Sequence, residues 1–277
     1  MISSLLKRSY HKYEVAICCI AKNEDPYFEE WIDYHIEIGV SHFYIYDNES
    51  TVPISSTLDA YIKKGLVTVE LISGTKMQMA AHRHCLANYG DHCRWIAFID
   101  VDEFIVPKTL TGSIVDFLKP YQKFGGLGVN WLIFGSNGHL NRPERPQLES
   151  YTRRSLVNHS INTHIKSIVQ PRYVKKVPND PHHFYYHFPK YCVNENFKRI
   201  KGAFADHTSN KIQLNHYFVR SLDEFKMKVA RGRADSNQER TVEEFYLVNE
   251  FANVVIDENI KEVRLIANTT NGTDTPT

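Results

Sequence analysis

The chain has 277 residues, of which 42% are hydrophobic and 23% are charged, and its formal net charge at pH 7 is +1. This composition is typical of a globular protein, and the near-neutral charge excludes a general electrostatic attraction to nucleic acid or to an anionic membrane. No apolar stretch is long enough to span a bilayer, and residues 1–10 lack the order and length of a signal peptide.

Strand and helix patterns alternate through the first hundred residues. Residues 15–21 form a continuous apolar run, which is typical of a parallel strand covered on both faces. Asp25 and Pro26 predict the start of a helix, and Gly39 predicts its end. Further strands are predicted at 42–46, 67–71 and 95–99, with helices between them at 58–64 and 76–88. Such βαβ units predict an α/β fold with a mostly parallel sheet flanked by helices.

Polar residues follow three of these strands, as Asn23–Glu24, Asp47–Asn48 and Asp100–Asp102. In sheets of this kind, ligands bind at the carboxyl ends of the strands. We therefore expect the three polar segments to converge on one site.

The acidic segment Asp100-Val101-Asp102-Glu103 is the most informative of these signals. Continued as a strand, the alternation of side chains would point Asp100 and Asp102 the same way. Clustered carboxylates are costly to bury unless a cation neutralises them, and Mg²⁺ or Mn²⁺ prefers such oxygen ligands. An ion that also carries a diphosphate would indicate a nucleotide-sugar enzyme. The alternative is an acidic, solvated turn, which is the commoner meaning of an isolated Asp-x-Asp.

The middle of the chain is less regular. Residues 125–134 predict one or two strands, and 165–169 and 173–177 predict short strands. Residues 135–139 predict a flexible polar loop that contains His139. The segment 131–139 could form a platform for a saccharide acceptor, with core packing and a surface turn as the alternative.

The last third is predicted to be helical. Ser221 with Glu224, and Thr241 with Glu244, fit the spacing of capping boxes. Residues 268–277 are polar and are predicted to form a disordered tail.

Two groups near the first of these helices are candidate site residues. His216 could complete a metal shell beside Asp102, or it could be an ordinary core or surface histidine. Lys228 and Arg231 share one helix face, which could bind a diphosphate or could be a solvated basic face. The residues alone leave these alternatives open.

The five cysteines are odd in number and include no Cys-x-x-Cys pair. We therefore expect neither a disulfide framework nor a zinc site, and we expect a reducing compartment.

Taken together, several blocks of the sequence resemble glycosyltransferase family 92, a group related to the family 2 transferases. Their order and spacing are specific, and they extend from about residue 15 to residue 232. The blocks are CIAKNE at 19–24, EWIDYH at 30–35, FYIYDNES at 43–50, WIAFIDVDEF at 95–104, WLIFGSNGH at 131–139, KSIV at 166–169 and HYFVRS at 216–221, followed by Glu224-Phe225, Lys228 and Arg231-Gly232.

This resemblance implies a GT-A-like fold, related to the Rossmann fold, with a helical C-terminal third. It implies a single catalytic domain at 1–267, with a nucleotide-binding half at about 13–120 and an acceptor half at about 121–267. It further implies a divalent metal, Mn²⁺ or Mg²⁺, and a UDP-sugar donor, with UDP-galactose favoured and inversion at the anomeric carbon. The chain resembles a stand-alone catalytic domain that works in the cytoplasm, at most peripherally on the membrane, on a saccharide or lipid-linked saccharide.

The resemblance also implies roles for individual residues. The predicted metal ligands are Asp100, Asp102 and His216, and the predicted nucleotide-binding residues are Asn23, Glu24, Asp47, Asn48, Asp100, Lys228 and Arg231.

No single residue is indicated as the base that deprotonates the acceptor; the candidates are His139, Glu103 and Asp180. Two other functions are considered: an inactive nucleotide-binding scaffold, and a nucleotidyltransferase on a related sheet, which would usually need two metal ions.

Overall fold

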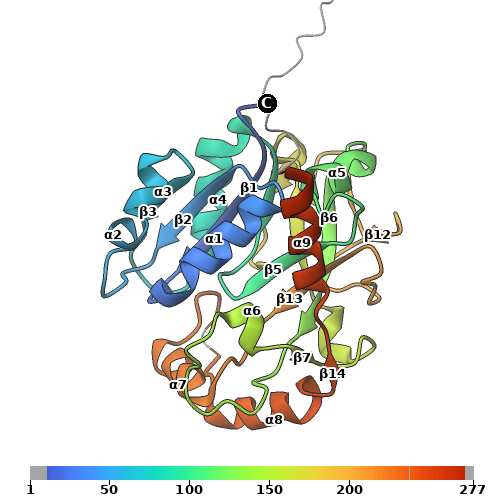
Figure 1. The fold of residues 1–277 in the computed structure, drawn as a ribbon. Coiled ribbons are helices and arrows are strands. Elements are labelled where there is room, and N and C mark those ends of the chain that lie inside the picture. Colours follow the sequence, from blue (N-terminus) through green and yellow to red (C-terminus); the bar gives the residue numbers. More distant parts are fainter. Residues whose placement is uncertain (1–10, 237, 272–277) are drawn as a thin grey trace, which may run out of the picture.

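The main sheet is mixed and mostly parallel, with helices on both sides of it (Figure 1). A computed structural model describes residues 11–236 and 238–271. Within these residues the main sheet has ten strands, eight of them in the order β12-β11-β6-β8-β4-β1-β2-β3, while β13 pairs with both β5 and β6. The predicted α/β class is therefore confirmed.

The first half of the chain builds the parallel part of the sheet, where β4, β1, β2 and β3 lie side by side. The predicted helix 58–64 forms as α3, and a short helix that was not predicted, α2, precedes it; Leu58 lies between the two outside the helical conformation. The elements are β1 (Tyr13–Ala21), α1 (Phe28–Glu37), β2 (His42–Asp47), α2 (Ile54–Thr57), α3 (Asp59–Lys63), β3 (Val67–Leu71), α4 (Gln78–Tyr89) and β4 (Cys93–Phe98).

The second half adds antiparallel strands and the C-terminal helices. Strand β8 runs antiparallel to both β4 and β6, so its first residues reach the edge of the sheet at which β4 ends. The elements are β5 (Glu103–Pro107), α5 (Ile114–Leu118), β6 (Gly126–Ile133), α6 (Gln147–Ser150), β7 (Arg153–Arg154), β8 (Ile165–Val169), β9 (Val174–Lys176), β10 (Tyr185–Tyr186), β11 (Cys192–Val193), β12 (Arg199–Ile200), β13 (Ile212–His216), α7 (Leu222–Arg231), α8 (Val242–Ala252), β14 (Val255–Ile256) and α9 (Asn259–Asn271).

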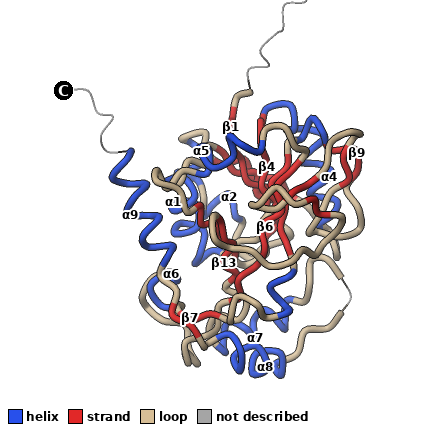
Figure 2. The backbone as a smooth tube through the Cα atoms, turned by 90° about the vertical axis from the view of Figure 1, so that its right-hand side faces the viewer, coloured by secondary structure: helices blue, strands red, loops and turns tan. Residues whose placement is uncertain are grey.

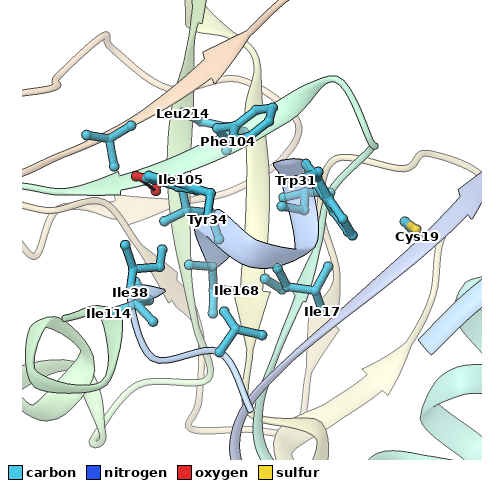
Figure 3. Packing of buried hydrophobic residues seen from close by; sticks show 14 of the residues in the cluster. Ile17, Cys19, Trp31, Tyr34, Ile38, Phe104, Ile105, Ile114, Ile168 and Leu214 are labelled. Atoms are coloured by element: carbon cyan, nitrogen blue, oxygen red, sulfur yellow. Dashed lines mark hydrogen bonds between the residues drawn. The ribbon is translucent and has the colours of Figure 1, made fainter. Parts of the chain in front are cut away.

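The largest core cluster packs α1 against the sheet and holds β5 in place (Figure 3). Trp31 and Tyr34 are fully buried on the inner face of α1. The Trp31 indole donates to the carbonyl of Glu103 at 2.8 Å, and the Tyr34 hydroxyl donates to the carbonyl of Ile105 at 2.8 Å. Helix α1 thus fixes the strand that leaves the acidic segment.

Strand pairing brings distant parts of the chain to this segment. In the antiparallel pair of β5 and β13, His216 lies opposite Glu103, and the backbone N–H of Tyr217 donates to the carbonyl of Asp102 at 2.8 Å. Helix α7 begins soon afterwards with the predicted capping box of Ser221 and Glu224. Figure 2 shows α7 and α8 together at one end of the molecule.

Two predictions for the last third are wrong. Residues 268–271 belong to α9 rather than to a disordered tail, and the remainder, 272–277, lies outside the described residues. The last turns of α9 are held by the hydroxyls of Thr269 and Thr270, which donate to carbonyls one turn earlier. Thr241 precedes α8 without a side-chain cap, because the Glu244 carboxylate accepts instead from Arg233 at 3.0 Å.

Each cysteine is buried and forms no disulfide, as predicted. In the described part of the chain, no helix combines the length and apolarity needed to cross a membrane.

Candidate active site

A polar cleft of about 270 Å³ opens where β1, β2 and β4 end. All three predicted polar segments contribute to it, as Glu24, Asn48 and the Asp100–Asp102 turn. The opposite wall comes from β13 and α7. Its polar lining consists of Lys22, Glu24, Asn48, Glu49, Thr75, Lys76, Gln78, Asp100, Asp102, Lys166, His182, His216, Lys228, Arg231, Arg233, Asp235 and Arg240.

Asp102 sits between two groups from the C-terminal half. Its carboxylate oxygens lie 2.5 Å from the Lys228 ammonium and 3.7 Å from Nε2 of His216. Burial acts to raise the pKa of Asp102, but Lys228 and His216 outweigh it and hold the pKa well below its usual range. Burial lowers the pKa of His216, so this imidazole is neutral at pH 7 and Nε2 can serve as a metal ligand.

Asp100 faces a different set of partners. Its carboxylate accepts from Nζ of Lys166 at 2.6 Å and from the Gln78 amide at 3.0 Å. The prediction that Asp100 and Asp102 point the same way assumed a continuing strand, but β4 ends at Phe98 and the two acids lie in a turn. Both acids line the cleft from this turn.

Glu24 joins the end of β1 to α7. Its two oxygens accept from Arg220 at 2.7 Å and from Arg231 at 2.6 Å. Burial acts to raise the pKa of Glu24, but Arg220, Arg231 and the nearby Lys228 lower it overall. The Glu24 carboxylate therefore stays ionised and anchors α7, the helix that carries Lys228 and Arg231.

Glu103 lies beneath the cleft rather than in it. Its side chain is fully buried, and it accepts from the Trp131 indole at 2.6 Å and from the backbone N–H of Asp100 at 2.9 Å. Burial raises the pKa of Glu103 to about 8, although Lys166 partly opposes the shift. These contacts fix the acidic turn and leave the carboxyl away from the cleft lining, so as a candidate base it does not reach a substrate there.

Two predicted nucleotide-binding residues hold loops together outside the cleft lining. Both oxygens of Asp47 accept from backbone N–H groups, of Ser50 and of Ile54, each at 2.9 Å. The amide oxygen of Asn23 accepts from the backbone of Thr51 at 2.7 Å. Asn48 does line the cleft, although its amide nitrogen is bound to the carbonyls of residues 72 and 74.

His139 and Asp180 also lie outside the cleft lining. The loop that contains His139 is held against the end of α8, where Asn249 and, just after the helix, Asn253 accept from backbone N–H groups of the loop. The His139 ring contacts the carbonyl of Ser150 at 3.2 Å. Asp180 accepts from the backbone of His182 at 2.8 Å. Of the predicted acceptor platform, Trp131 alone among the described residues of 131–139 lines the cleft.

Three important residues were not assigned roles from the sequence. Lys166 carries the charge opposite Asp100, Arg220 carries the charge opposite Glu24, and His182 lines the cleft next to the Trp131 ring. Lys166 and Arg220 both lie in blocks that resemble the family, KSIV at 166–169 and HYFVRS at 216–221, and this was the available signal for them.

Asp102 and His216 have the chemistry of a divalent metal site. Among the described residues no group of three or more His, Cys, Asp or Glu side chains forms a metal cage. Mg²⁺ and related ions, however, are commonly held by one or two carboxylates together with substrate phosphates and water. A carboxylate oxygen and a neutral imidazole nitrogen 3.7 Å apart fit that pattern, because two ligands of about 2.1 Å can bind one ion at this separation.

Comparison with known proteins agrees with the resemblance of the sequence blocks. A protein of Ricinus communis described as a glycosyltransferase family 92 protein is 29% identical over 231 residues, which cover 81% of this chain and 39% of that protein. Galactan beta-1,4-galactosyltransferase GALS2 of Arabidopsis thaliana is 31% identical over 135 residues, which cover 44% of this chain and 26% of that protein. The chain thus spans well under half the length of these relatives.

Among solved structures, S. aureus TarS residues 1–349 in complex with UDP-GlcNAc aligns with a TM-score of 0.39 and 16% identity, over 57% of this chain and 45% of that one. The sequence model described as "Glycosyltransferase family 92" matches residues 11–264. The chain therefore belongs to glycosyltransferase family 92, and its fold class is the GT-A-like α/β class that the resemblance implied.

Proposed function

We propose that the chain is a metal-dependent, inverting glycosyltransferase that moves a hexose from a UDP-sugar to a hydroxyl group of a saccharide or a lipid-linked saccharide. The observation that carries the proposal is the convergence of Asp102, His216, Lys228 and Arg231 in one cleft at the carboxyl ends of the parallel strands. Galactose is the favoured sugar because of the partial match to a galactan galactosyltransferase.

The leaving diphosphate needs cations, and the cleft is rich in them. Lys22, Lys76, Lys228, Arg231, Arg233 and Arg240 all contribute to its lining. Lys228 acts as a point charge, whereas Arg231 can donate two parallel hydrogen bonds to phosphate oxygens. These charges stabilise the negative charge that grows on the departing UDP.

Asp102 and His216 are the residues that would hold a divalent ion. When bound, the ion would supply further positive charge at the diphosphate. Asp100 lies within the same turn and is bound to Lys166, so we assign it a supporting place beside the ion or the ribose. The unpaired, buried thiols fit a reducing compartment.

The acceptor hydroxyl needs a hydrogen-bond acceptor, and His182 offers one. Its Nδ1 lies 2.9 Å from the carbonyl of Ile165; because a carbonyl only accepts, Nδ1 carries the proton and Nε2 is left as an acceptor. Burial and the nearby Lys166 lower the pKa of His182 to about 4, which keeps the ring neutral. We propose that His182 orients the acceptor, in place of the more remote His139, Glu103 and Asp180.

Turnover of UDP-galactose with Mn²⁺ tests the proposal. Asp102→Asn should lower kcat by about 10²–10³-fold, because an electrostatic contact to the transition state is lost. Asp91→Asn is the matched control, since Asp91 is exposed near the opposite end of the same strand. A chelator should abolish the activity of the wild type.

The outcomes separate the candidate functions. Full turnover by Asp102→Asn rejects the metal-ligand role. UDP binding without sugar release, with any of a panel of UDP-sugars, indicates a nucleotide-binding scaffold. Release of pyrophosphate from a nucleotide and a sugar phosphate indicates a nucleotidyltransferase.

A further inference from the structure

A second concave site lies beside the cleft, lined by residues of the β9–β10 pair and of the β11–β12 pair, and β12 is the outer strand of the main sheet on this side. It has a volume of about 400 Å³. We call it the basic groove, because its lining contains the cations Lys175, Lys176, Lys190, Arg199 and Lys201 and no carboxylate.

The segment that builds the groove is strongly cationic within a near-neutral chain. Residues 171–203 contain seven lysines and arginines and two acids, Asp180 and Glu195, whereas the net charge of the whole chain is +1. Glu195 is buried and accepts from the backbone of residues 210, 211 and 212. Asp180 accepts from residue 182 and lies 3.2 Å from the His183 ring. Neither acid therefore neutralises the groove.

The cations of the groove have no carboxylate partner in the described chain, although the Lys190 ammonium donates to the carbonyl of Lys123 at 2.7 Å. Within the described chain, none of the five takes part in an ion pair: the pairs recorded there involve other lysines and arginines. Lys175, Lys176, Arg199 and Lys201 are exposed to solvent. Five positive charges around one concavity repel one another, and an anionic ligand would relieve that repulsion.

The groove also has flat aromatic surfaces. Tyr185, Tyr186 and Tyr191 line it, and Tyr185 is 49% exposed. The guanidinium of Arg199 lies 4.8 Å from the centroid of the Tyr191 ring, which fixes a cation next to an apolar face. Rings of this kind offer an apolar face with a polar edge, which suits the C–H face and hydroxyl groups of a sugar ring.

One short segment separates the groove from the cleft. Pro181 and His182 line the cleft, whereas the next two residues, His183 and Phe184, line the groove. A chain molecule that places one end in the cleft would therefore have its following units within reach of the groove.

We propose that the basic groove binds a saccharide that carries carboxylate groups, as the extended part of the acceptor. The role of the groove as an acceptor site rests on the proposed transferase function, whereas its binding of an acidic saccharide does not. A concave site beside a sugar-transfer cleft favours a glycan over a lipid surface, since a bilayer requires a protruding rather than a hollow face.

Binding of oligogalacturonate to the whole chain by titration calorimetry tests this proposal. The wild type binds the oligosaccharide at low ionic strength, binds it less tightly as salt rises, and does not bind the fully methyl-esterified form, which keeps the rings but loses the charges. Lys175→Ala/Lys176→Ala weakens binding about tenfold. The matched control is Lys63→Ala/Lys64→Ala, an adjacent exposed pair on the far side of the sheet order, and it binds as the wild type does.

Several results would overturn the proposal. They are the absence of binding by the wild type, equal binding of the methyl ester, and unchanged affinity of the Lys175→Ala/Lys176→Ala variant. Binding to equimolar phosphatidylserine–phosphatidylcholine vesicles without binding to oligogalacturonate would assign the groove to a membrane instead. UDP affinity, measured on the same samples, reports on the cleft separately, so a failure of the proposed function is distinguished from a failure of the groove. Thermal melts of each variant confirm that it is folded.

Discussion

The ammonium nitrogen of Lys228 lies 2.5 Å from a carboxylate oxygen of Asp102, although the two residues are 126 positions apart in the sequence. Both side chains are largely buried, at 6% and 14% exposure. Asp102, which we expect to hold a divalent ion, is therefore already neutralised by the single positive charge of Lys228. In the proposed function, we expect donor binding to move the Lys228 ammonium from Asp102 to the diphosphate.

Replacing Lys228 with methionine should show whether a divalent ion can take the place of Lys228 as the counter-charge of Asp102. Removing one member of a buried pair leaves an uncompensated charge, so we expect the free energy of unfolding to fall by about 3 kcal/mol. Millimolar Mn²⁺ should restore part of this loss, because the ion neutralises Asp102 in the folded state. Chemical denaturation with Mn²⁺ and with chelator measures both effects. An equal response of the variant and the wild type to Mn²⁺ would contradict the interpretation.

The two arginines on Glu24 should differ in their roles. Arg231 lines the cleft and is 24% exposed, so Arg231→Ala should weaken UDP binding about tenfold and cost about 1 kcal/mol of stability. Arg220 is 2% exposed and stacks on Tyr27 at 3.4 Å, so Arg220→Ala should cost about 3 kcal/mol. Calorimetric titration with UDP and urea unfolding of both variants provide the comparison. If both variants lost the same UDP affinity and the same unfolding free energy, the two arginines would not differ in their roles.

Glu224 should make stability depend on pH. Its carboxyl accepts from the hydroxyls of Ser221 and Tyr151, and burial raises its pKa from 4.5 to about 7, although Lys228 partly opposes the shift. The folded chain therefore binds more protons than the unfolded chain between these two pH values, so stability falls as pH rises through this window.

Glu224→Gln keeps an acceptor oxygen for Ser221 and Tyr151 but cannot ionise. We expect it to remove on the order of 2 kcal/mol of the decrease in unfolding free energy between pH 4.5 and 7. Urea unfolding at a series of pH values gives the two slopes. A wild type and a variant with parallel slopes would show that Glu224 keeps an ordinary pKa.

Trp131 should report ligand binding by fluorescence. It lines the cleft, whereas Trp31 and Trp95 are 0% and 2% exposed. A donor or acceptor in the cleft should therefore protect the protein from acrylamide quenching, and Trp131→Phe should lose this protection. The variant should also lose about 1–2 kcal/mol of stability, because Glu103 loses a buried donor. Protection that persists in the variant would place the ligand elsewhere.

The regular elements were the part of the fold that local patterns could predict. The apolar runs of β1 to β4 and the capping box of α7 depend on neighbouring residues, and these predictions are confirmed. The predicted start of α1 is wrong: Asp25 begins a 3-10 turn and its carboxylate accepts from Thr57, whereas α1 begins at Phe28 without a side-chain cap. The ends of the strands near the site were harder to predict. Strand β4 ends at Phe98, so Asp100 and Asp102 lie in a turn, where the alternation of side chains along a strand does not apply.

The partners of the site residues depend on contacts that no local pattern encodes. Asp100 meets Lys166 because β8 runs antiparallel to β4 and its start reaches the end of that strand. The loop of His139 is held outside the cleft by Asn249 of α8 and Asn253 just after it, which bind the backbone of residues 136 and 137 from more than a hundred positions later. Asp47 is the exception, since an aspartate followed three residues later by Ser50 predicts a turn in which the carboxylate binds backbone N–H groups.

Because β13 pairs with β5, the site can assemble during synthesis only after both strands have been made. The acidic turn leaves the ribosome first, and the strand and helix that carry its counter-charges follow more than a hundred residues later. Until β13 and α7 are synthesised, burial of the acidic turn would leave its carboxylates without counter-charges, which costs several kcal/mol. The nascent chain is therefore expected to keep the acidic turn open to solvent until α7, which carries Lys228, has been translated.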